Sequence, residues 1–302
     1  MINCALVGFG RWGRVIYKSI QKNNFLSLKY VCYNKTIEKN LIDKKIVITN
    51  NIHDVKFNKI DLVFIAADSI INYKLCKFFL LKGKNIFIEK PIVTDIPQLK
   101  EILKLSKKLK LILHVNYIHI YNKNFIKFCE YFKKNYNLNT KQQIFFKFGS
   151  DGPIRKNINA VWDWGPHVFS CLFSLLGSLN EFKIDKMMID ENDYKGKLNF
   201  VVRGNYKSNL NIELFFGNKF KKKKTSIVFK NKNNIYRYED NGLIVDNKKF
   251  FKNKDFIDIM PLDFSINNLI NKINNKVYIK DSISLEITKI LKKIDNKLLK
   301  LK

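Results

Sequence analysis

The stretch Val7-Gly8-Phe9-Gly10-Arg11-Trp12-Gly13-Arg14 decides the fold of this chain. Its glycines form a G-x-G-x-x-G pattern between an apolar run over residues 2–7 and a helix-like stretch over residues 14–21. At such a junction the first glycine makes a tight turn, the second lets the backbone approach a pyrophosphate, and the third packs the helix against the strand. The pyrophosphate then lies against N–H groups at the positive end of the helix. We therefore predict a dinucleotide-binding turn here; the alternative is a glycine-rich turn in an unrelated α/β domain.

Strand-like and helix-like segments alternate over residues 1–121. The apolar run over residues 61–67 is typical of a strand buried on both faces of a parallel sheet. A helix is predicted over residues 70–82, with Gly83 as its stop. This alternation predicts a Rossmann domain with a doubly wound parallel sheet, which binds ligands at the carboxyl ends of its strands.

The pattern changes in residues 122–302. Helices are predicted over residues 123–135 and 167–176, and the sequence between residues 182 and 249 is mostly strand-like. Two further helices follow, over about 264–273 and 282–299. We predict an α+β domain for substrate binding and oligomerisation, with a large, mostly antiparallel open-faced sheet and a C-terminal helix that could pack back on the first domain.

Composition supports a globular protein of two domains. The chain has 302 residues, 46% of them hydrophobic, and a net charge of +30 from 56 Lys and Arg against 26 Asp and Glu. Lys, Asn, Ile and Phe are abundant together, and all four have A/T-rich codons. The lysines are also scattered, with one local run at residues 221–224. We therefore interpret the charge as compositional drift and expect no nucleic-acid partner; a phosphorylated substrate and nucleic acid remain the alternatives.

The cysteines and the hydropathy indicate a cytoplasmic protein. No CxxC pair or ligand-like spacing occurs, so we expect reduced core cysteines and no metal site. We find neither an apolar run long enough for a membrane helix nor a signal peptide, and we expect no membrane partner. The five cysteines are Cys4, Cys32, Cys76, Cys129 and Cys171.

A second motif, Glu89-Lys90-Pro91, directly follows the predicted strand over residues 85–88. A lysine at the carboxyl end of a strand faces the ligand crevice, where partial burial would lower the pKa of its amine and make it available for proton exchange. Pro91 fixes the turn that presents Lys90. The alternative is a surface lysine in a lysine-rich chain.

The third motif is Trp162-Asp163-Trp164-Gly165-Pro166-His167. If the helix already starts at Asp163, with Pro166 in its first turn, then Asp163 and His167 share one face. A carboxylate beside an imidazole selects its tautomer and raises its basicity, which suits a general base. The alternative is an aspartate that caps the helix and a histidine packed beneath it.

These three motifs, in this order, resemble the Gfo/Idh/MocA family, named after glucose–fructose oxidoreductase and inositol dehydrogenase. The similarity is densest over residues 3–13, 61–94, 114–122 and 152–177. The segments Gly152-Pro153-Ile154-Arg155 and 162–167 are most similar to the branch that acts on nucleotide-linked or amino sugars. The resemblance implies NAD(P)-dependent oxidation or reduction of sugar-like carbons by a homo-oligomer. It also implies that His167 exchanges the hydroxyl proton, assisted by Asp163 and Lys90.

Motif positions and the resemblance together assign the remaining site residues. The loop after the second strand reads Tyr33-Asn34-Lys35-Thr36, without the carboxylate that would bind the ribose hydroxyls of NAD, which favours NADP over NAD. The expected cofactor-binding residues are Gly8, Phe9, Gly10, Arg11, Trp12, Gly13, Asn34, Lys35, Ala67, Asn72, Glu89 and Lys90. The expected substrate-binding residues are Lys90, Asn116, Tyr121, Arg155, Trp164 and His167.

Two departures from the family pattern affect the substrate side. Residues 68–72 read Asp-Ser-Ile-Ile-Asn where the family usually has prolines and a histidine, and Val168 stands where an aspartate is common. The sequence thus predicts an NAD(P)-dependent enzyme that transfers a hydride to or from a sugar or nucleotide-sugar carbon. The alternatives are a polyol dehydrogenase of the inositol type, a catalytically silent dinucleotide-binding regulator, and a basic nucleic-acid-binding protein.

Overall fold

The computed structural model describes residues 1–37, 41–152, 154–155, 157–194, 197–239, 242–246, 248–252, 260–278, 281 and 283–299. Pro153 and Ser282, which the sequence patterns include, lie outside these residues. The chain forms two compact units, residues 1–116 with 262–285 and residues 117–261 with 286–302. The predicted division of the chain into domains after residue 121 stays a prediction. Residues 262–285 join the first unit through side-chain contacts that no local pattern reveals, such as a hydrogen bond from Asn23 Nδ2 to Asn267 Oδ1 of 2.8 Å.

The first unit contains the predicted parallel sheet, in the order β3-β2-β1-β4-β5-β6. Every pairing in it is parallel, and the central strands are buried along most of their length, which explains their continuous apolar runs. The doubly wound fold predicted from the alternating pattern is confirmed. The strands are β1 (Ile2–Val7), β2 (Leu26–Cys32), β3 (Val47–Thr49), β4 (Leu62–Ile65), β5 (Asn85–Glu89) and β6 (Leu113–Asn116).

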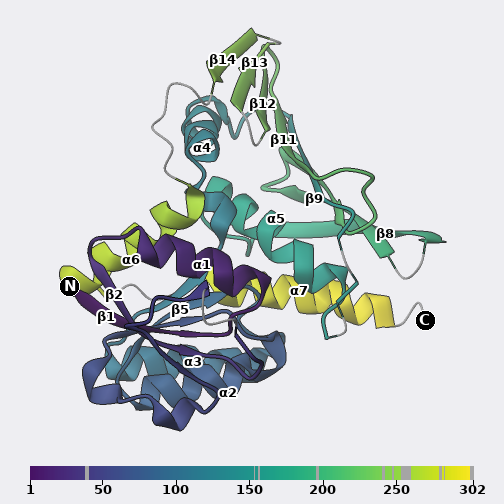
Figure 1. Ribbon diagram of the computed structural model, residues 1–302. Helices are drawn as coiled ribbons and strands as arrows, with labels where there is room; N and C mark the ends of the chain where they lie inside the picture. Colours follow the sequence, from purple (N-terminus) through teal and green to yellow (C-terminus); the bar gives the residue numbers. More distant parts are fainter. Residues whose placement is uncertain are drawn as a thin grey trace. The chain divides into compact units, whose positions relative to one another are not determined.

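Helices cover both faces of this sheet. Figure 1 shows α1 (Arg11–Gln21) and α6 (Pro261–Asn274) on one face, and α2 (Ser69–Leu81) and α3 (Ile96–Leu109) on the other. The Asp68 carboxylate caps α2 by accepting from Ile70 N at 3.1 Å, and Gly83 follows that helix with φ of +72°. The helix and its glycine stop are therefore as predicted.

Helix α6 also covers a buried histidine of β6. His114 lies 4% exposed, stacks on Phe87 with ring centroids 5.4 Å apart, and is 2.9 Å from Ser265 Oγ through its Nε2. Burial lowers the pKa of His114 to about 3, and the positive charge of Lys272 acts in the same direction. His114 therefore belongs to the packing between α6 and the sheet.

This histidine makes stability fall in acid. Its pKa is lower in the folded than in the unfolded chain, where it is about 6.5, so its contribution is complete above about pH 6.5 and is lost as the pH falls toward 3. At pH 5 the loss is about 2 kcal/mol. We expect urea unfolding of His114→Gln to lose that much less free energy between pH 7 and pH 5 than the wild type. Equal losses in the two proteins would contradict this role.

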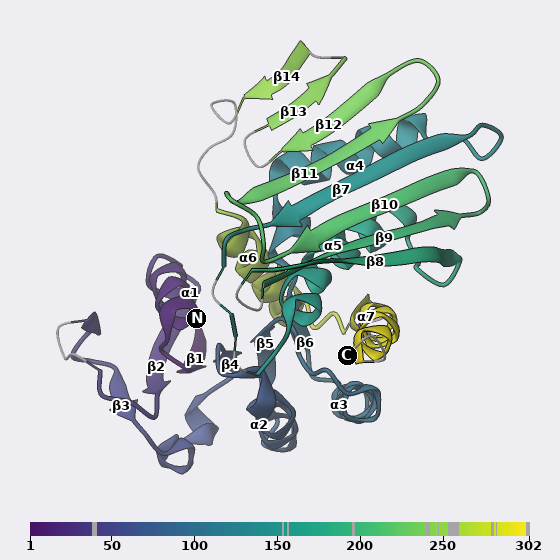
Figure 2. The same ribbon diagram turned by 90° about the vertical axis from the view of Figure 1, so that its right-hand side faces the viewer.

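The second unit is built on an eight-stranded sheet in the order β14-β13-β12-β11-β7-β10-β9-β8 (Figure 2). All its pairings are antiparallel except that of β7 with β10, so the predicted, mostly antiparallel sheet is confirmed. The strands are β7 (Gln142–Gly149), β8 (Phe182–Tyr194), β9 (Lys197–Tyr206), β10 (Leu210–Gly217), β11 (Lys224–Lys230), β12 (Ile235–Glu239), β13 (Gly242–Val245) and β14 (Lys248–Lys252).

The described part of this unit includes α4 (Lys123–Asn135), α5 (Ala160–Leu176) and most of α7 (Ile283–Leu299). Helices α4 and α5 pack on one face of the sheet (Figure 2). The predicted start of α5, at His167 or at Asp163, is wrong. Asn159 caps the helix by accepting from Val161 N and Trp162 N at 3.0 and 3.3 Å, so Pro166 lies in the helix interior. The Asn159 cap acts together with hydrogen bonds from Asn159 and Trp162 to Asp295 of α7, which hold this helix start although Pro166 disfavours it.

Candidate dinucleotide site and acid–base cluster

The glycine loop lies between β1 and α1 and has little room for side chains at two of its three glycines. Gly8 has φ of +96°, and a Cβ built on it would lie 2.4 Å from Ala66 O. A Cβ on Gly13 would lie 2.2 Å from Gly8 O. A Cβ on Gly10, by contrast, would meet no described atom within 4 Å. The first and third glycines therefore close the turn, while the second leaves open space beside the start of α1, where a pyrophosphate would lie.

Side chains of this loop have different roles. Phe9 is 1% exposed and packs edge-on against Tyr17 and Tyr33, with ring centroids 5.6 and 6.5 Å apart, so its side chain is part of the core. Arg11 is exposed and Trp12 is half-buried. The N-cap residue is Gly10, and the first turn of α1 contains no acidic residue. This helix end therefore keeps its positive character for an anion.

Glu89 is held at the end of β5 by its neighbour on β6. Asn116 Nδ2 donates to Glu89 Oε1 at 2.6 Å, and the two residues are paired in the sheet register. Burial raises the pKa of Glu89, and interactions with Asn116, Trp12 and Lys90 oppose that rise. Asn116, expected to contact substrate, thus fixes a carboxylate of the Glu-Lys-Pro motif.

Asn72 holds the other side of the same motif. Its Nδ2 donates to Pro91 O at 3.1 Å, and the Lys90–Pro91 peptide bond is cis. Lys90 itself is half-buried. The side-chain oxygens of Asn72 and Asn116 are both buried and accept no hydrogen bond within the described part of the chain. A buried acceptor without a donor costs roughly 1–3 kcal/mol, so these two amide oxygens fit a site completed by a ligand.

Three further predicted cofactor residues follow the two strands that flank β1 in the sheet. Asn34 and Lys35 are exposed after β2, and Ala67 is half-buried after β4. Both strands pair with β1, so these residues and the glycine loop lie at the same edge of the sheet. An open glycine, a helix N-terminus and two unpaired amide oxygens on this edge together fit a dinucleotide.

In the second unit, α5 presents Asp163, Trp164 and His167, all half-buried. Arg155, expected to bind a substrate anion, pairs with Asp163: its Nε lies 3.1 Å from Asp163 Oδ2. The arginine side chain is 55% exposed and the aspartate 15%. The predicted substrate arginine and the predicted catalytic carboxylate are therefore one ion pair, with the guanidinium still open to solvent.

His167 contacts a histidine that the sequence patterns left without a role. The rings of His119 and His167 are 4.7 Å apart between centroids and nearly perpendicular, at 83°. His119 also packs edge-on against Phe148 at 5.2 Å, and Trp164 lies 5.8 Å from His167. His119 comes from a 3-10 turn over Ile118–Tyr121, which also carries the predicted residue Tyr121. The only sequence signal for it is a second histidine near the predicted site segment.

Helix α7 fixes the start of α5. Asp295 Oδ2 accepts from Trp162 Nε1 at 3.0 Å, and Asp295 Oδ1 accepts from Asn159 Nδ2 at 2.7 Å. A Cβ on Gly165 would lie 2.3 Å from Leu291 Cδ2, so the two helices approach closely at that glycine. The turn that bears Asp163 is thereby anchored from outside its own helix.

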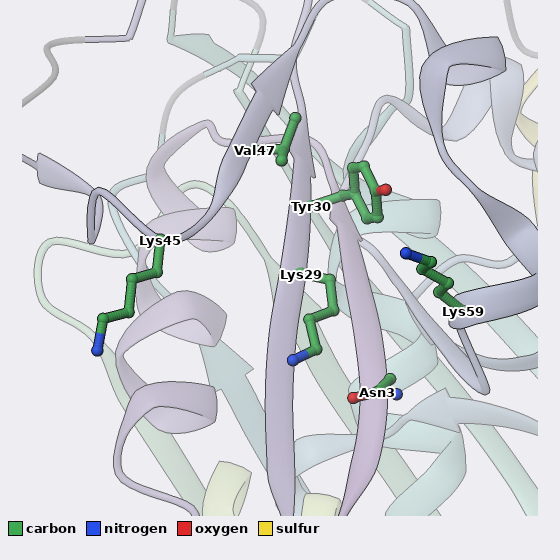
Figure 3. A pocket seen from close by; sticks show the side chains of 6 residues that line it. All are labelled: Asn3, Lys29, Tyr30, Lys45, Val47 and Lys59. Carbon is green, nitrogen blue, oxygen red and sulfur yellow. The ribbon is translucent and has the colours of Figure 1, made fainter.

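A hollow of about 400 Å³ lies elsewhere in the first unit (Figure 3). Its residues stand near the amino ends of β1, β3 and β4 and within β2, whereas the predicted cofactor residues follow carboxyl ends. Figure 3 shows its lysine side chains spread around Tyr30 and Val47 without converging on one point. The hollow is therefore distinct from the dinucleotide site. It is lined by Asn3, Lys29, Tyr30, Lys45, Val47 and Lys59.

The described residues offer neither a membrane-spanning helix nor a cluster of metal ligands. They contain no helix that is both long and apolar enough to cross a membrane. They also contain no group of three or more His, Cys, Asp or Glu side chains placed to hold a metal ion. The five cysteines, all of them in the described part of the chain, form no disulfide, and four of them are buried.

Comparison with known proteins agrees with the resemblance over the first part of the chain. Residues 2–117 match the model of an oxidoreductase family with an NAD-binding Rossmann fold. No curated protein sequence matches the chain significantly.

Solved structures share the fold over nearly the whole chain. A dehydrogenase (MviM) from Clostridium difficile is 18% identical, with a TM-score of 0.81 over 98% of this chain and 99% of that one. UDP-N-acetylglucosamine 3-dehydrogenase GnnA from Acidithiobacillus ferrooxidans is 12% identical, with a TM-score of 0.76 over 96% and 95%. KijD10, a 3-ketoreductase from Actinomadura kijaniata in complex with TDP-benzene and NADP, is 10% identical, with a TM-score of 0.75 over 95% and 94%.

Proposed function

We propose that this chain, whose residues 2–117 match the Gfo/Idh/MocA oxidoreductase family, transfers a hydride between a nicotinamide cofactor and a nucleotide-linked sugar. The observation that carries this proposal is the glycine loop, whose outer glycines leave no room for a side chain and whose central glycine borders open space. The substrate class is supported by the fold shared with GnnA and KijD10.

The residues of the two units have separate tasks. In the first unit Gly8, Gly10 and Gly13 hold the pyrophosphate, and the amide oxygens of Asn72 and Asn116 are available to polar groups of the cofactor. When bound, the nicotinamide supplies the acceptor or donor of the hydride. His167 of the second unit takes or gives the hydroxyl proton and Asp163 orients it, while Lys90 of the first unit handles a second proton and stabilises negative charge on the substrate oxygen.

Turnover with defined substrates tests this function. Purified protein is incubated with NAD⁺ or NADP⁺ and a UDP-linked N-acetyl sugar, the free sugar, or an inositol, and formation of reduced cofactor is followed by absorbance. We expect turnover with the nucleotide-linked sugar alone. Turnover with inositol would establish the polyol alternative. Cofactor binding without turnover on a wide panel of sugars would favour a silent dinucleotide-binding regulator.

We propose NADP as the preferred cofactor because exposed Lys35 can pair with a 2′-phosphate. Lys35→Asp is expected to shift the ratio of NADPH to NADH affinity by about tenfold toward NADH, since the carboxylate repels the phosphate and accepts from ribose hydroxyls. Quenching of Trp12 fluorescence by each reduced cofactor measures the two affinities. Lys29→Asp, which changes an exposed lysine within β2 in the same way, is the matched control. An unchanged ratio in Lys35→Asp would contradict the assignment.

The cellular setting predicted from the sequence also stays a proposal. We propose a cytoplasmic homo-oligomer in which the face of the second sheet opposite α4 and α5 meets another copy. That face carries half-buried Phe145 and Phe215 beside the charged pair of Arg203 and Glu213. Sedimentation of the purified chain tests the oligomer. The net charge of +30 is proposed to be compositional, and binding to generic RNA that disappears in moderate salt would agree with that reading.

A further inference from the structure

Two of the four histidines of this chain lie against each other beside the proposed acid–base site. His119 and His167 meet edge to face, with centroids 4.7 Å apart. The other two are elsewhere: His53 is exposed and contacts Phe78, and His114 is buried beneath α6. The two that meet come from different elements, the 3-10 turn over residues 118–121 and α5. The fold therefore brings together two proton-accepting rings that are 48 positions apart in the sequence.

The geometry of this pair favours binding of one proton and disfavours binding of a second. In a perpendicular arrangement the edge of one ring points at the π-face of the other, which is favourable when the edge belongs to a charged imidazolium. Two charged rings at this distance repel each other strongly. The order of binding follows from these effects: the first proton is bound more tightly than by a lone imidazole, and the second more weakly.

Two of the neighbours that flank the pair are uncharged aromatic side chains. These are Phe148 and Trp164. Tyr121, from the same turn as His119, carries a phenol that is neutral at ordinary pH. The carboxylate one turn before His167, Asp163, is already paired with the guanidinium of Arg155. The nearest carboxylate of α5 is therefore already engaged by a positive charge.

We propose that His119 and His167 form a coupled imidazole pair that takes up its two protons in separate steps, with His119 as a positioning residue for His167. This inference rests on the proposed function for its catalytic meaning. In the oxidation direction the substrate C–H bond breaks and its electron pair leaves as hydride to the nicotinamide. The O–H bond breaks with its proton passing to His167, and the C=O bond forms. The contact with His119 holds the ring of His167 in place while it carries this proton, and reduction returns the same proton.

Titration of the histidine rings tests the coupling without substrate or cofactor. Ring Cε1–H signals of the full-length protein are followed by NMR against pH, and each is assigned by its loss in His53→Gln, His119→Phe or His167→Asn. We expect the wild-type pair to titrate in two steps separated by more than about one pH unit. In His119→Phe, which keeps an aromatic edge, His167 should titrate in a single step between the two.

His53→Gln is the matched control, because His53 also contacts an aromatic edge but lies in the first unit. It should leave both steps unchanged. If His119→Phe disturbs the fold, as seen in amide spectra, His119→Gln replaces it. A His167 midpoint that is the same with and without His119 would overturn the proposal.

Kinetics separates this proposal from the proposed function. The acid limb of the pH profile of kcat/KM is expected to move by about one pH unit in His119→Phe, with turnover retained at the optimum. Coupled titration together with full turnover in His167→Asn would keep the pair but reject the catalytic role of His167. Loss of turnover in His167→Asn together with independent titration would keep that role and reject the pair.

Discussion

Alanine at Gly13 is expected to destabilise the protein by about 3 kcal/mol or more and to abolish cofactor binding. The new Cβ would lie 2.2 Å from the backbone oxygen of Gly8, an atom that cannot turn away as a flexible side chain would. Either α1 moves off the strand or the glycine turn opens, and both changes displace the N–H groups that would hold the pyrophosphate. Urea unfolding and fluorescence titration with NADPH measure the two effects.

Gly10→Ala is the matched control for this substitution. The same methyl group is added in the same loop, where no described atom lies within 4 Å of it. Stability should change by less than about 1 kcal/mol, whereas affinity for the cofactor should fall by about tenfold or more, because the methyl group occupies the space the pyrophosphate needs. Unaltered affinity in a folded Gly10→Ala protein would show that this loop does not bind the dinucleotide.

Replacement of His167 by asparagine is expected to lower kcat by about 10² to 10⁴-fold, the range lost with a general acid or base. Asparagine keeps a polar side chain of similar size but cannot exchange a proton at neutral pH. The dissociation constant for NADPH should stay the same, since the predicted cofactor residues all belong to the first unit. Stopped-flow measurement of hydride transfer under single-turnover conditions isolates the affected step.

His53→Gln, which removes an exposed histidine from the first unit, should leave kcat unchanged. A kcat of His167→Asn within threefold of the wild type, on a substrate that the wild type turns over, would remove this residue from the mechanism. If Gly10→Ala at the same time shows the expected loss of cofactor affinity, the motifs of this chain would bind the cofactor but would not transfer the proton.

Local sequence patterns predicted the bounds of a helix correctly where a single physical signal determined them. Helix α4 was predicted with the bounds that the structure shows, since Asn122 caps it and its apolar positions repeat at helical spacing. Helix α5 was predicted to start several residues late, because Gly165 and Pro166 read as helix breakers. Its true start depends on the Asn159 cap and on Asp295 of α7, a residue more than a hundred positions away.

The candidate site likewise has features that the sequence pattern predicts and features that it does not. The order of strands and loops places the glycine loop, Lys35, Ala67 and Lys90 at one edge of the sheet, and the pattern indicates that edge directly. Side-chain partners are different, because they depend on how distant elements pack. The pairing of Arg155 with Asp163 and the contact of His119 with His167 are of this kind, and no spacing in the sequence specifies either.

The first unit is assembled from two stretches of chain, residues 1–116 and 262–285. During synthesis on the ribosome its closing helix, α6, emerges only after most of the second unit has been made. Until then the surface of β6 around His114 lacks its cover, so the nascent Rossmann domain can form its sheet but cannot complete its core. The first unit therefore reaches its native state only after residues 262–285 have been made, and a stop codon shortly before residue 262 would remove α6 from the first unit and most of α7 from the second.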